Sequence, residues 1–184
     1  MESVTRDSSR AIRTSAEGTL YVFLGIVLLH WAEHVVQAVQ IYVLDWPKTE
    51  ALGLLGLAVP GLVRSEWLHW GYNLAVFAGL WLLMPGFERP AGRWWKAALL
   101  VQGWHFTEHG LLLFQAVTAV HLLGVDVPTS VLQLVVPRVE LHLFYNGIVT
   151  ALLLVGAVMR LRGERGRRSS WWRRPVRAAE PTRS

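Results

Sequence analysis

The sequence contains no cysteine, and this absence removes several kinds of chemistry. Without a thiol there is no disulfide, no thiolate metal ligand and no cysteine nucleophile. Only three methionines are present, so a soft sulfur site of the kind that selects copper(I) is also disfavoured. Any metal site in this chain must therefore be built from nitrogen and oxygen ligands.

Charged residues are scarce as well. They make up 17% of the 184 residues, whereas hydrophobic residues make up 53%, and the mean hydropathy is +0.34. A soluble domain has about 25% charged residues, so this composition is typical of a small polytopic membrane protein whose main partner is the lipid bilayer. Ten tryptophans, several of them beside apolar runs, fit the aromatic belts at membrane interfaces.

Four apolar stretches are long enough to cross a bilayer, which takes about 20 helical residues. We predict an all-α membrane protein with four transmembrane helices, at residues 18–44, 67–84, 94–123 and 139–161. Two shorter apolar segments, at residues 51–63 and 127–136, contain or flank proline. We expect them to lie at the membrane interface or to re-enter the membrane from the two long loops.

The positions of Arg and Lys predict the orientation. The N-terminal tail (1–17), the short middle loop and the C-terminal tail (162–184) carry nearly all of them, and the two long loops carry only Lys48, Arg64 and Arg138. By the positive-inside rule both termini are cytoplasmic, and we expect a multi-pass protein of the cell membrane. The Arg-rich C-terminal tail is expected to lie on anionic lipid rather than to bind nucleic acid.

A pattern of His, Glu and His at positions i, i+3 and i+4 occurs twice inside the apolar stretches. On a helix this spacing places all three side chains on one face, within about 100° of arc. A Gln follows six residues after the second His of each copy. The two copies are His30, Glu33, His34 and Gln40, and then His105, Glu108, His109 and Gln115.

A second pattern, H-x-x-Y-N, follows each copy of the first, near the start of the second and fourth predicted helices. Six of the seven histidines thus belong to one duplicated unit, and only His121 lies outside it. We predict two tandem helical hairpins, residues 18–84 and 94–161, related by a pseudo-twofold axis along the membrane normal. The second pattern consists of His69, Tyr72 and Asn73, and then of His142, Tyr145 and Asn146.

The duplicated unit predicts a metal site. An ionisable side chain at membrane depth costs at least about 2.5–3.5 kcal/mol, so six imidazoles and two carboxylates there need partners. A bound cation supplies them, and His at i and i+4 lets one helix bind a metal through two ligands. Two ions, each with about three His and one Glu as ligands, would account for these residues. One ion would also account for them if Glu and Asn hydrogen-bond to its ligands.

The predicted ligands are imidazoles and carboxylates, a set that suits iron, zinc or manganese. They are His30, Glu33, His34, His69, His105, Glu108, His109 and His142. The other recurring polar residues are expected to hydrogen-bond to the ligands and to fix the tautomers of the rings. These are Gln40, Tyr72, Asn73, Gln115, Tyr145 and Asn146.

Histidine-rich motifs on the helices of a membrane protein resemble the histidine boxes of the membrane di-iron enzymes, the fatty-acid desaturases and hydroxylases. The boxes of those enzymes have the form H-x-x-H-H, and Glu33 and Glu108 stand where such a box has a His. The resemblance implies a di-iron oxidoreductase with a hydrophobic substrate and an electron-transfer partner, and it favours iron. It covers His30, His34, His69, His105, His109 and His142.

Other functions remain open at this point. Facing His on the first and third helices would ligate one haem b, as in a cytochrome b-type electron carrier, but four His and two Glu would then have no role. A metal transporter or sensor would use the same site, although the cytoplasmic halves of the helices are too apolar for an ion path. A structural polar network needs no metal. The string H-x-x-E-H also occurs in a class of metalloproteases, which need no repeat.

Overall fold

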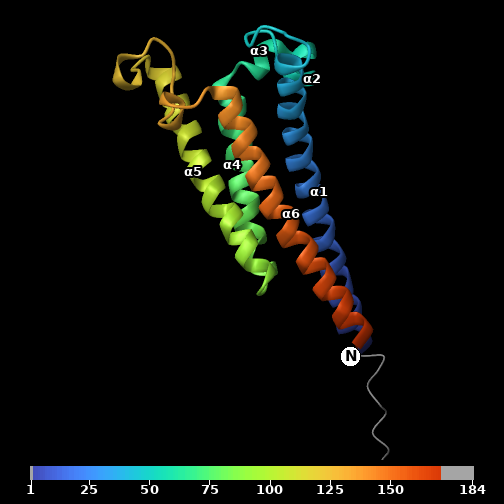
Figure 1. Cartoon of the computed structure of the whole chain (residues 1–184). Coiled ribbons are helices and arrows are strands. Elements are labelled where there is room, and N and C mark those ends of the chain that lie inside the picture. Colours follow the sequence, from blue (N-terminus) through green and yellow to red (C-terminus); the bar gives the residue numbers. More distant parts are fainter. Residues whose placement is uncertain (1, 171–184) are drawn as a thin grey trace, which may run out of the picture.

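The computed structural model describes the backbone of residues 2–170 and the side chains of residues 17–164 except residue 123. Within this range the chain is all-α, as the sequence predicts (Figure 1). Its helices are α1 (Glu2–Tyr42), α2 (Gly53–Ala58), α3 (Pro60–Val63), α4 (Glu66–Leu83), α5 (Ala91–Thr118) and α6 (Arg138–Ser170). Three 3-10 turns complete the order: η1 (Met84–Gly86), η2 (Leu122–Gly124) and η3 (Leu132–Leu134).

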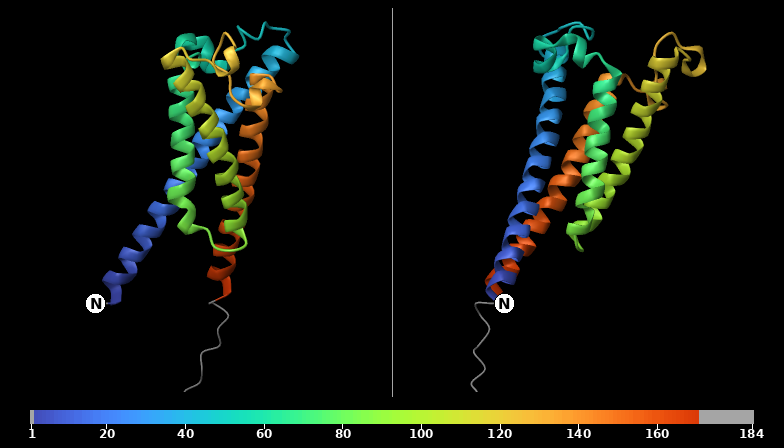
Figure 2. Two further views of the ribbon diagram at one scale, coloured as in Figure 1. Left: turned by 90° about the vertical axis from the view of Figure 1, so that its left-hand side faces the viewer. Right: turned by 180° about the vertical axis from the view of Figure 1, so that it is seen from behind.

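The four long helices lie side by side as a bundle (Figures 1 and 2). α5 packs against both α4 and α6, whereas α1 packs mainly against α6 and touches α4 little. We call one end of the bundle the tail end, because the N-terminus and the last residues of α6 lie there together with the η1 turn. The opposite end, the loop end, carries the two long loops with α2, α3, η2 and η3.

The helix boundaries differ most from the predicted ones at three places. α1 begins at Glu2, so the backbone of the predicted N-terminal tail continues the first helix. α5 ends at Thr118, before the predicted residue 123, because Ala119 takes a left-handed conformation and its N–H returns to the carbonyl of Gln115. α6 continues to Ser170, well past the predicted end at 161, over a stretch rich in helix-forming Arg. The rest of the predicted C-terminal tail, residues 171–184, lies outside the described residues.

The two apolar loop segments fold differently from each other. Residues 51–63 form the short helices α2 and α3, and Pro60 starts α3 at a position where a missing N–H costs no helical bond. Residues 127–136, flanked by Pro128 and Pro137, contain only the η3 turn. Both segments lie at the loop end of the bundle (Figure 1).

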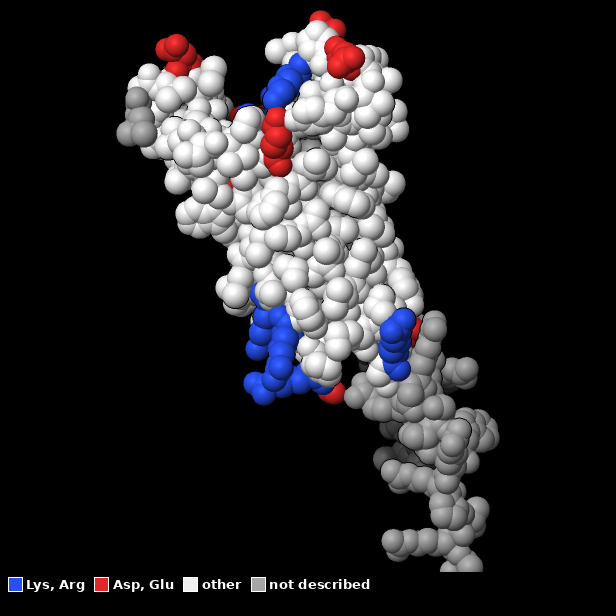
Figure 3. Space-filling model, in the orientation of Figure 1, with Lys and Arg blue, Asp and Glu red and all other residues white. Residues whose placement is uncertain are grey.

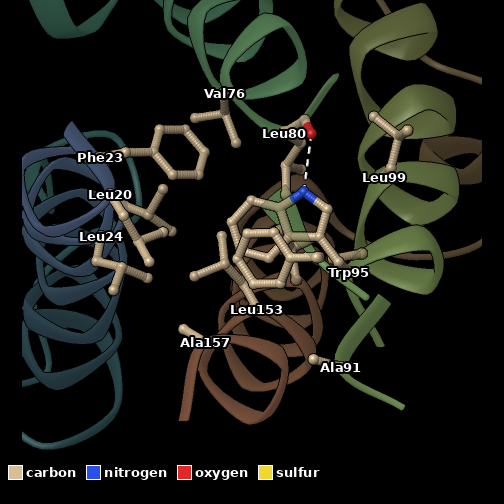
Figure 4. Packing of buried hydrophobic residues seen from close by; sticks show 14 residues of the cluster. Leu20, Phe23, Leu24, Val76, Leu80, Ala91, Trp95, Leu99, Leu153 and Ala157 are labelled. Carbon is tan, nitrogen blue, oxygen red and sulfur yellow. Dashed lines mark hydrogen bonds between the residues drawn. The ribbon is translucent and has the colours of Figure 1, made fainter. Parts of the chain in front are cut away.

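An apolar core fills the tail half of the bundle (Figure 4). Trp95 of α5 is fully buried there, and its indole N–H donates a hydrogen bond to the carbonyl of Leu80 at 2.8 Å. That carbonyl is one of the last four of α4, which have no partner within an ideal helix. Phe87 stacks on Trp95 with ring centroids 3.8 Å apart. Because this half is closed by hydrocarbon, the polar residues of the interior gather in the loop half.

Two of the described helices are long and apolar enough to cross a membrane, over Glu17–Tyr42 in α1 and Arg138–Glu164 in α6. α4 and α5 do not meet the same measure of length and apolarity. They carry several Trp together with His, Asn and Gln of the duplicated unit, all of which lower the mean hydropathy of a helix. The four-span arrangement therefore stays a prediction.

Candidate metal site

The six histidines of the duplicated unit come together in the loop half of the bundle. Two come from α1, one from α4, two from α5 and one from α6. Their rings form a chain of contacts with centroid distances from 4.6 to 6.1 Å. We call this set the histidine cluster: His30, His34, His69, His105, His109 and His142.

The tightest part of the cluster is the group that we call the His triad, His105, His109 and His142. One nitrogen of each ring lies within 4.8 Å of those of the other two, and the residues are 2%, 1% and 5% exposed. The Nε2 atoms of His109 and His142 are 3.1 Å apart. Two nitrogens on one tetrahedral ion, each about 2.0–2.1 Å from it, lie about 3.3 Å apart. The His triad therefore could hold a metal ion.

Unpartnered nitrogens support this assignment. Among the described residues, neither ring nitrogen of His105 and not the Nδ1 of His109 has a hydrogen-bond partner, although all three atoms are buried. A buried polar atom without a partner costs about 1–3 kcal/mol. Coordination of a cation through the lone pair of a nitrogen removes this cost for that nitrogen. The donor set of the His triad thus fits a metal ion.

The histidines at the start of α4 and α6 are oriented by one shared contact. The Nδ1 of His142 donates to the carbonyl of Arg138 at 2.7 Å, and the Nδ1 of His69 donates to the carbonyl of Ser65 at 2.9 Å. A proton on Nδ1 leaves the lone pair of a neutral imidazole on Nε2. Both rings therefore carry their lone pair on Nε2, which is the usual way that a backbone carbonyl prepares a metal-binding His, and the Nε2 of His142 faces that of His109.

The histidines of α1 form a pair rather than part of a triad. The Nε2 atoms of His30 and His34 are 3.0 Å apart, and the Nδ1 of His34 donates to the amide oxygen of Gln37 at 3.1 Å. The ring of His69, which would complete a second triad, instead contacts those of His109 at 5.8 Å and of His142 within the cluster. Gln37 was not predicted, although its place three residues after His34 on a helix is a signal for such a bond.

The predicted tyrosine partners stack on rings. Tyr72 lies against His30 with centroids 3.6 Å apart and planes 18° apart, and Tyr145 lies against His105 at 4.4 Å and 28°. Each Tyr thus covers the first His of one motif copy. This contact restricts the ring by packing, whereas hydrogen bonds to the ligands are predicted from the sequence.

The predicted asparagine partners bind the backbone of the histidines rather than their rings. Asn73 donates to the carbonyl of His69 and Asn146 to the carbonyl of His142, both at 2.9 Å. The side chain of Gln102, which the sequence analysis did not select, donates to the Oδ1 of Asn73 at 2.8 Å. These contacts form a polar layer between the histidine cluster and the apolar core.

Both glutamates contact loops. The carboxylate of Glu33 accepts the backbone N–H of Leu54 at 2.7 Å and of Leu55 at 3.2 Å, at the start of α2. The carboxylate of Glu108 accepts the N–H of Leu132 at 3.0 Å, at the start of η3. The first N–H groups of a helical segment have no partner within it, so a carboxylate satisfies them well. The candidate metal group of the described residues contains no carboxylate, and Glu33 and Glu108 as ligands stay a prediction.

Both glutamines hold the same two loops. Gln40 accepts the N–H of Gly53 at 2.8 Å and donates to its carbonyl at 3.5 Å. Gln115 accepts the N–H of Thr129 at 3.3 Å and donates to its carbonyl at 2.8 Å. Together with the glutamate contacts, these bonds form what we call the loop clamps. The glutamines therefore fix the loops over the cluster, and the expected bonds to the metal ligands are not among their contacts.

No protein-family model matches the chain, and the searches of curated proteins and of solved structures found no similar protein.

Proposed function

We propose that this protein is an integral-membrane metalloprotein, an oxidoreductase in which the histidine cluster binds one or two ions, iron before zinc or manganese. The observation that carries the proposal is the buried His triad, because its nitrogens lie close enough together to hold a metal ion and three of its six ring nitrogens lack a hydrogen-bond partner. When bound, iron would supply redox chemistry to a hydrophobic substrate.

The surface of the bundle supports a membrane location with four spans. Large apolar side chains are more than half exposed on all four long helices, for example Leu29, Leu82, Leu100 and Phe144. Soluble monomers rarely expose apolar surface so widely. On the face that Figure 3 shows, a broad band without charged residues separates the loop end, where both signs occur, from the mainly basic tail end. In this proposal the tail end is cytoplasmic and the loop end faces outward.

Two close pairs of nitrogens support a site for two ions. The Nε2 atoms of His30 and His34 are 3.0 Å apart, nearly the same separation as those of His109 and His142. Each pair suits two ligands of one ion, so the cluster has room for two ions that share its six rings. Imidazole ligands suit iron, zinc and manganese, and the resemblance to the histidine-box enzymes favours iron.

A metal transporter is the weaker proposal. Transport needs a polar path through the bundle, but the tail half is filled by an apolar core around Trp95 and Leu80. A haem carrier would bind its cofactor through two facing histidines, and its optical spectrum would distinguish it at once.

Metal analysis of the protein purified in detergent tests the proposal. We expect wild type to contain one or two equivalents of metal per chain without a Soret band, and His109→Ala to lose at least one equivalent. His121→Ala is the matched control, because His121 lies outside the duplicated unit and should be replaceable without loss of metal. Equal metal content in the two variants, absence of metal from wild type after growth with added iron, zinc and manganese, or a Soret band would each refute the proposed site.

A further inference from the structure

A cavity of about 230 Å³ opens at the loop end and reaches the histidine cluster. His34, His69 and His142 form part of its wall, together with Gln37. A second cavity of about 110 Å³ shares His34, Gln37 and His69 with the first, so the two adjoin each other at these side chains. A molecule in these cavities would therefore lie directly against the nitrogens that are proposed to bind metal.

The wall of the larger cavity carries three basic residues and no acidic one. These are Lys48, Arg64 and Arg138, the same three that the two long loops contain. Two of them have counter-ions just beside the cavity. Arg138 binds both carboxylate oxygens of Glu66, at 2.6 and 2.8 Å, and Lys48 lies 2.6 Å from a carboxylate oxygen of Glu140. The hydrogen bond to Glu140 raises the pKa of Lys48, which keeps its charge.

The third basic residue, Arg64, has no counter-ion among the described residues. One Nη of its guanidinium donates to the carbonyl of Thr49 at 3.1 Å, and no described carboxylate pairs with it. A guanidinium presents five N–H donors in a planar fork that matches a carboxylate or a phosphate. The cavity mouth thus holds one cation whose charge and donors are available to an anion.

Negative charge beside the histidine cluster would stabilise a bound divalent ion. Neutral imidazoles do not compensate the charge of a divalent ion, and the two carboxylates that could do so, Glu33 and Glu108, bind loop N–H groups. An uncompensated charge in a buried site is costly. An anion that enters the cavity from the loop end would supply this compensation where the metal needs it.

We propose that the cavity binds an oxyanion, a carboxylate or a phosphate, between Arg64 at the mouth and the histidine cluster at the inner wall. This inference rests on the proposed function and names the substrate class: a small molecule with one anionic group. The smaller cavity is lined by apolar side chains such as Leu55 and Leu68 and also by Glu33, whose carboxylate accepts loop N–H groups, so this cavity would take an apolar part of the same molecule rather than its anionic group. The oxyanion itself is common to a free soluble acid and to an anionic amphiphile from the membrane.

Calorimetric titration of the full-length protein in a non-ionic detergent tests the inference. The probes are inorganic phosphate, acetate and octanoate, with octanol as the neutral counterpart of octanoate. We expect saturable binding of at least one anion and none of octanol, with affinity reduced about tenfold or more in Arg64→Gln. Arg89→Gln is the matched control, because Arg89 is exposed in the turn at the tail end and should be replaceable without effect. Tighter binding of octanoate than acetate would identify an amphiphile as the source of the anion, and equal affinity a soluble acid.

The outcomes separate this inference from the proposed function, because metal content is measured on the same samples. Metal without saturable anion binding, or equal affinity in Arg64→Gln and Arg89→Gln, overturns the anion site and leaves the metal site standing. If a protein without metal binds an anion in a way that depends on Arg64, the metal site is overturned and the anion site stands. If Arg64→Gln does not fold, Arg64→Lys replaces it: it keeps the charge but lacks the fork, and unchanged affinity in that variant would also overturn the assignment.

Discussion

In the first half of the molecule α1 crosses α6 and barely touches its own partner α4, whereas in the second half α5 and α6 pack closely along each other. The histidines follow this difference. His105, His109 and His142 are all buried and converge, while in the first half only His34 is buried and His30 and His69 are half-buried. The same residue pattern therefore gives a closed group of three where its two helices pack closely, and a less buried set where they make few contacts.

The two halves differ in the packing of their histidines, but they hold their long loops through similar hydrogen bonds. In each half the Glu accepts a backbone N–H at the start of a short helical segment. The Gln binds the N–H and carbonyl of one residue, which is Gly53, the first residue of α2, in one half and Thr129, three residues before η3, in the other. These loops differ in sequence and fold, yet they are clamped by the same two positions of the motif. The histidines of the motif thus form the candidate site, whereas its Glu and Gln bind the two long loops at the loop end.

The largest expected effect is a loss of metal affinity when one histidine of each half is replaced by alanine. His142→Ala removes a buried member of the His triad, so we expect metal affinity to fall by more than about 100-fold, beyond the loss typical of a residue behind a ligand. His69→Ala removes a half-buried ring without a close partner in α1, and the loss should be smaller. Chelator competition on the purified variants measures both. A larger loss in His69→Ala would place the principal site in the first half.

The next effect separates the two roles that a glutamate can have. Glu108→Ala leaves the N–H of the half-buried Leu132 without its acceptor, so the protein should lose unfolding free energy at the lower end of the range of about 1–3 kcal/mol. Glu108→Gln keeps an acceptor oxygen and should restore most of this stability with metal content unchanged. Glu33→Ala should cost less because Glu33 is only half-buried.

Metal content and unfolding in detergent are measured on the same preparations. Together they decide whether Glu108 holds the loop or binds the metal. As a ligand, Glu108 could not be replaced by the neutral amide, so Glu108→Gln would lose metal even where it keeps its stability. That result would restore the carboxylates to the metal site and remove the need for an external anion.

Much of this arrangement was predictable from the sequence. The apolar runs predict the long helices, and the i, i+4 spacing predicts that each His pair shares a face. The hydrogen-bond partners of the Glu33 and Glu108 carboxylates were not predictable, because they depend on where the folded loops place their free N–H groups. The contacts of His69 with His109 and His142 also arise only from the packing of α4 against α5, a long-range relation that no local pattern encodes.

The smallest expected effect is the difference in stability between two glycine substitutions, one in each long loop. Gly53 and Gly124 both have positive φ angles, of 74° and 71°, and alanine in this conformation costs about 1–2 kcal/mol. At Gly124 a Cβ would meet open space, so Gly124→Ala should cost only this amount. At Gly53 a Cβ would also collide with the carboxylate of Glu33, and Gly53→Ala should therefore cost more and raise amide exchange over residues 53–58. Equal losses of unfolding free energy, with unchanged exchange in that segment, would mean that Glu33 does not hold the loop and that the first clamp is absent in the folded protein.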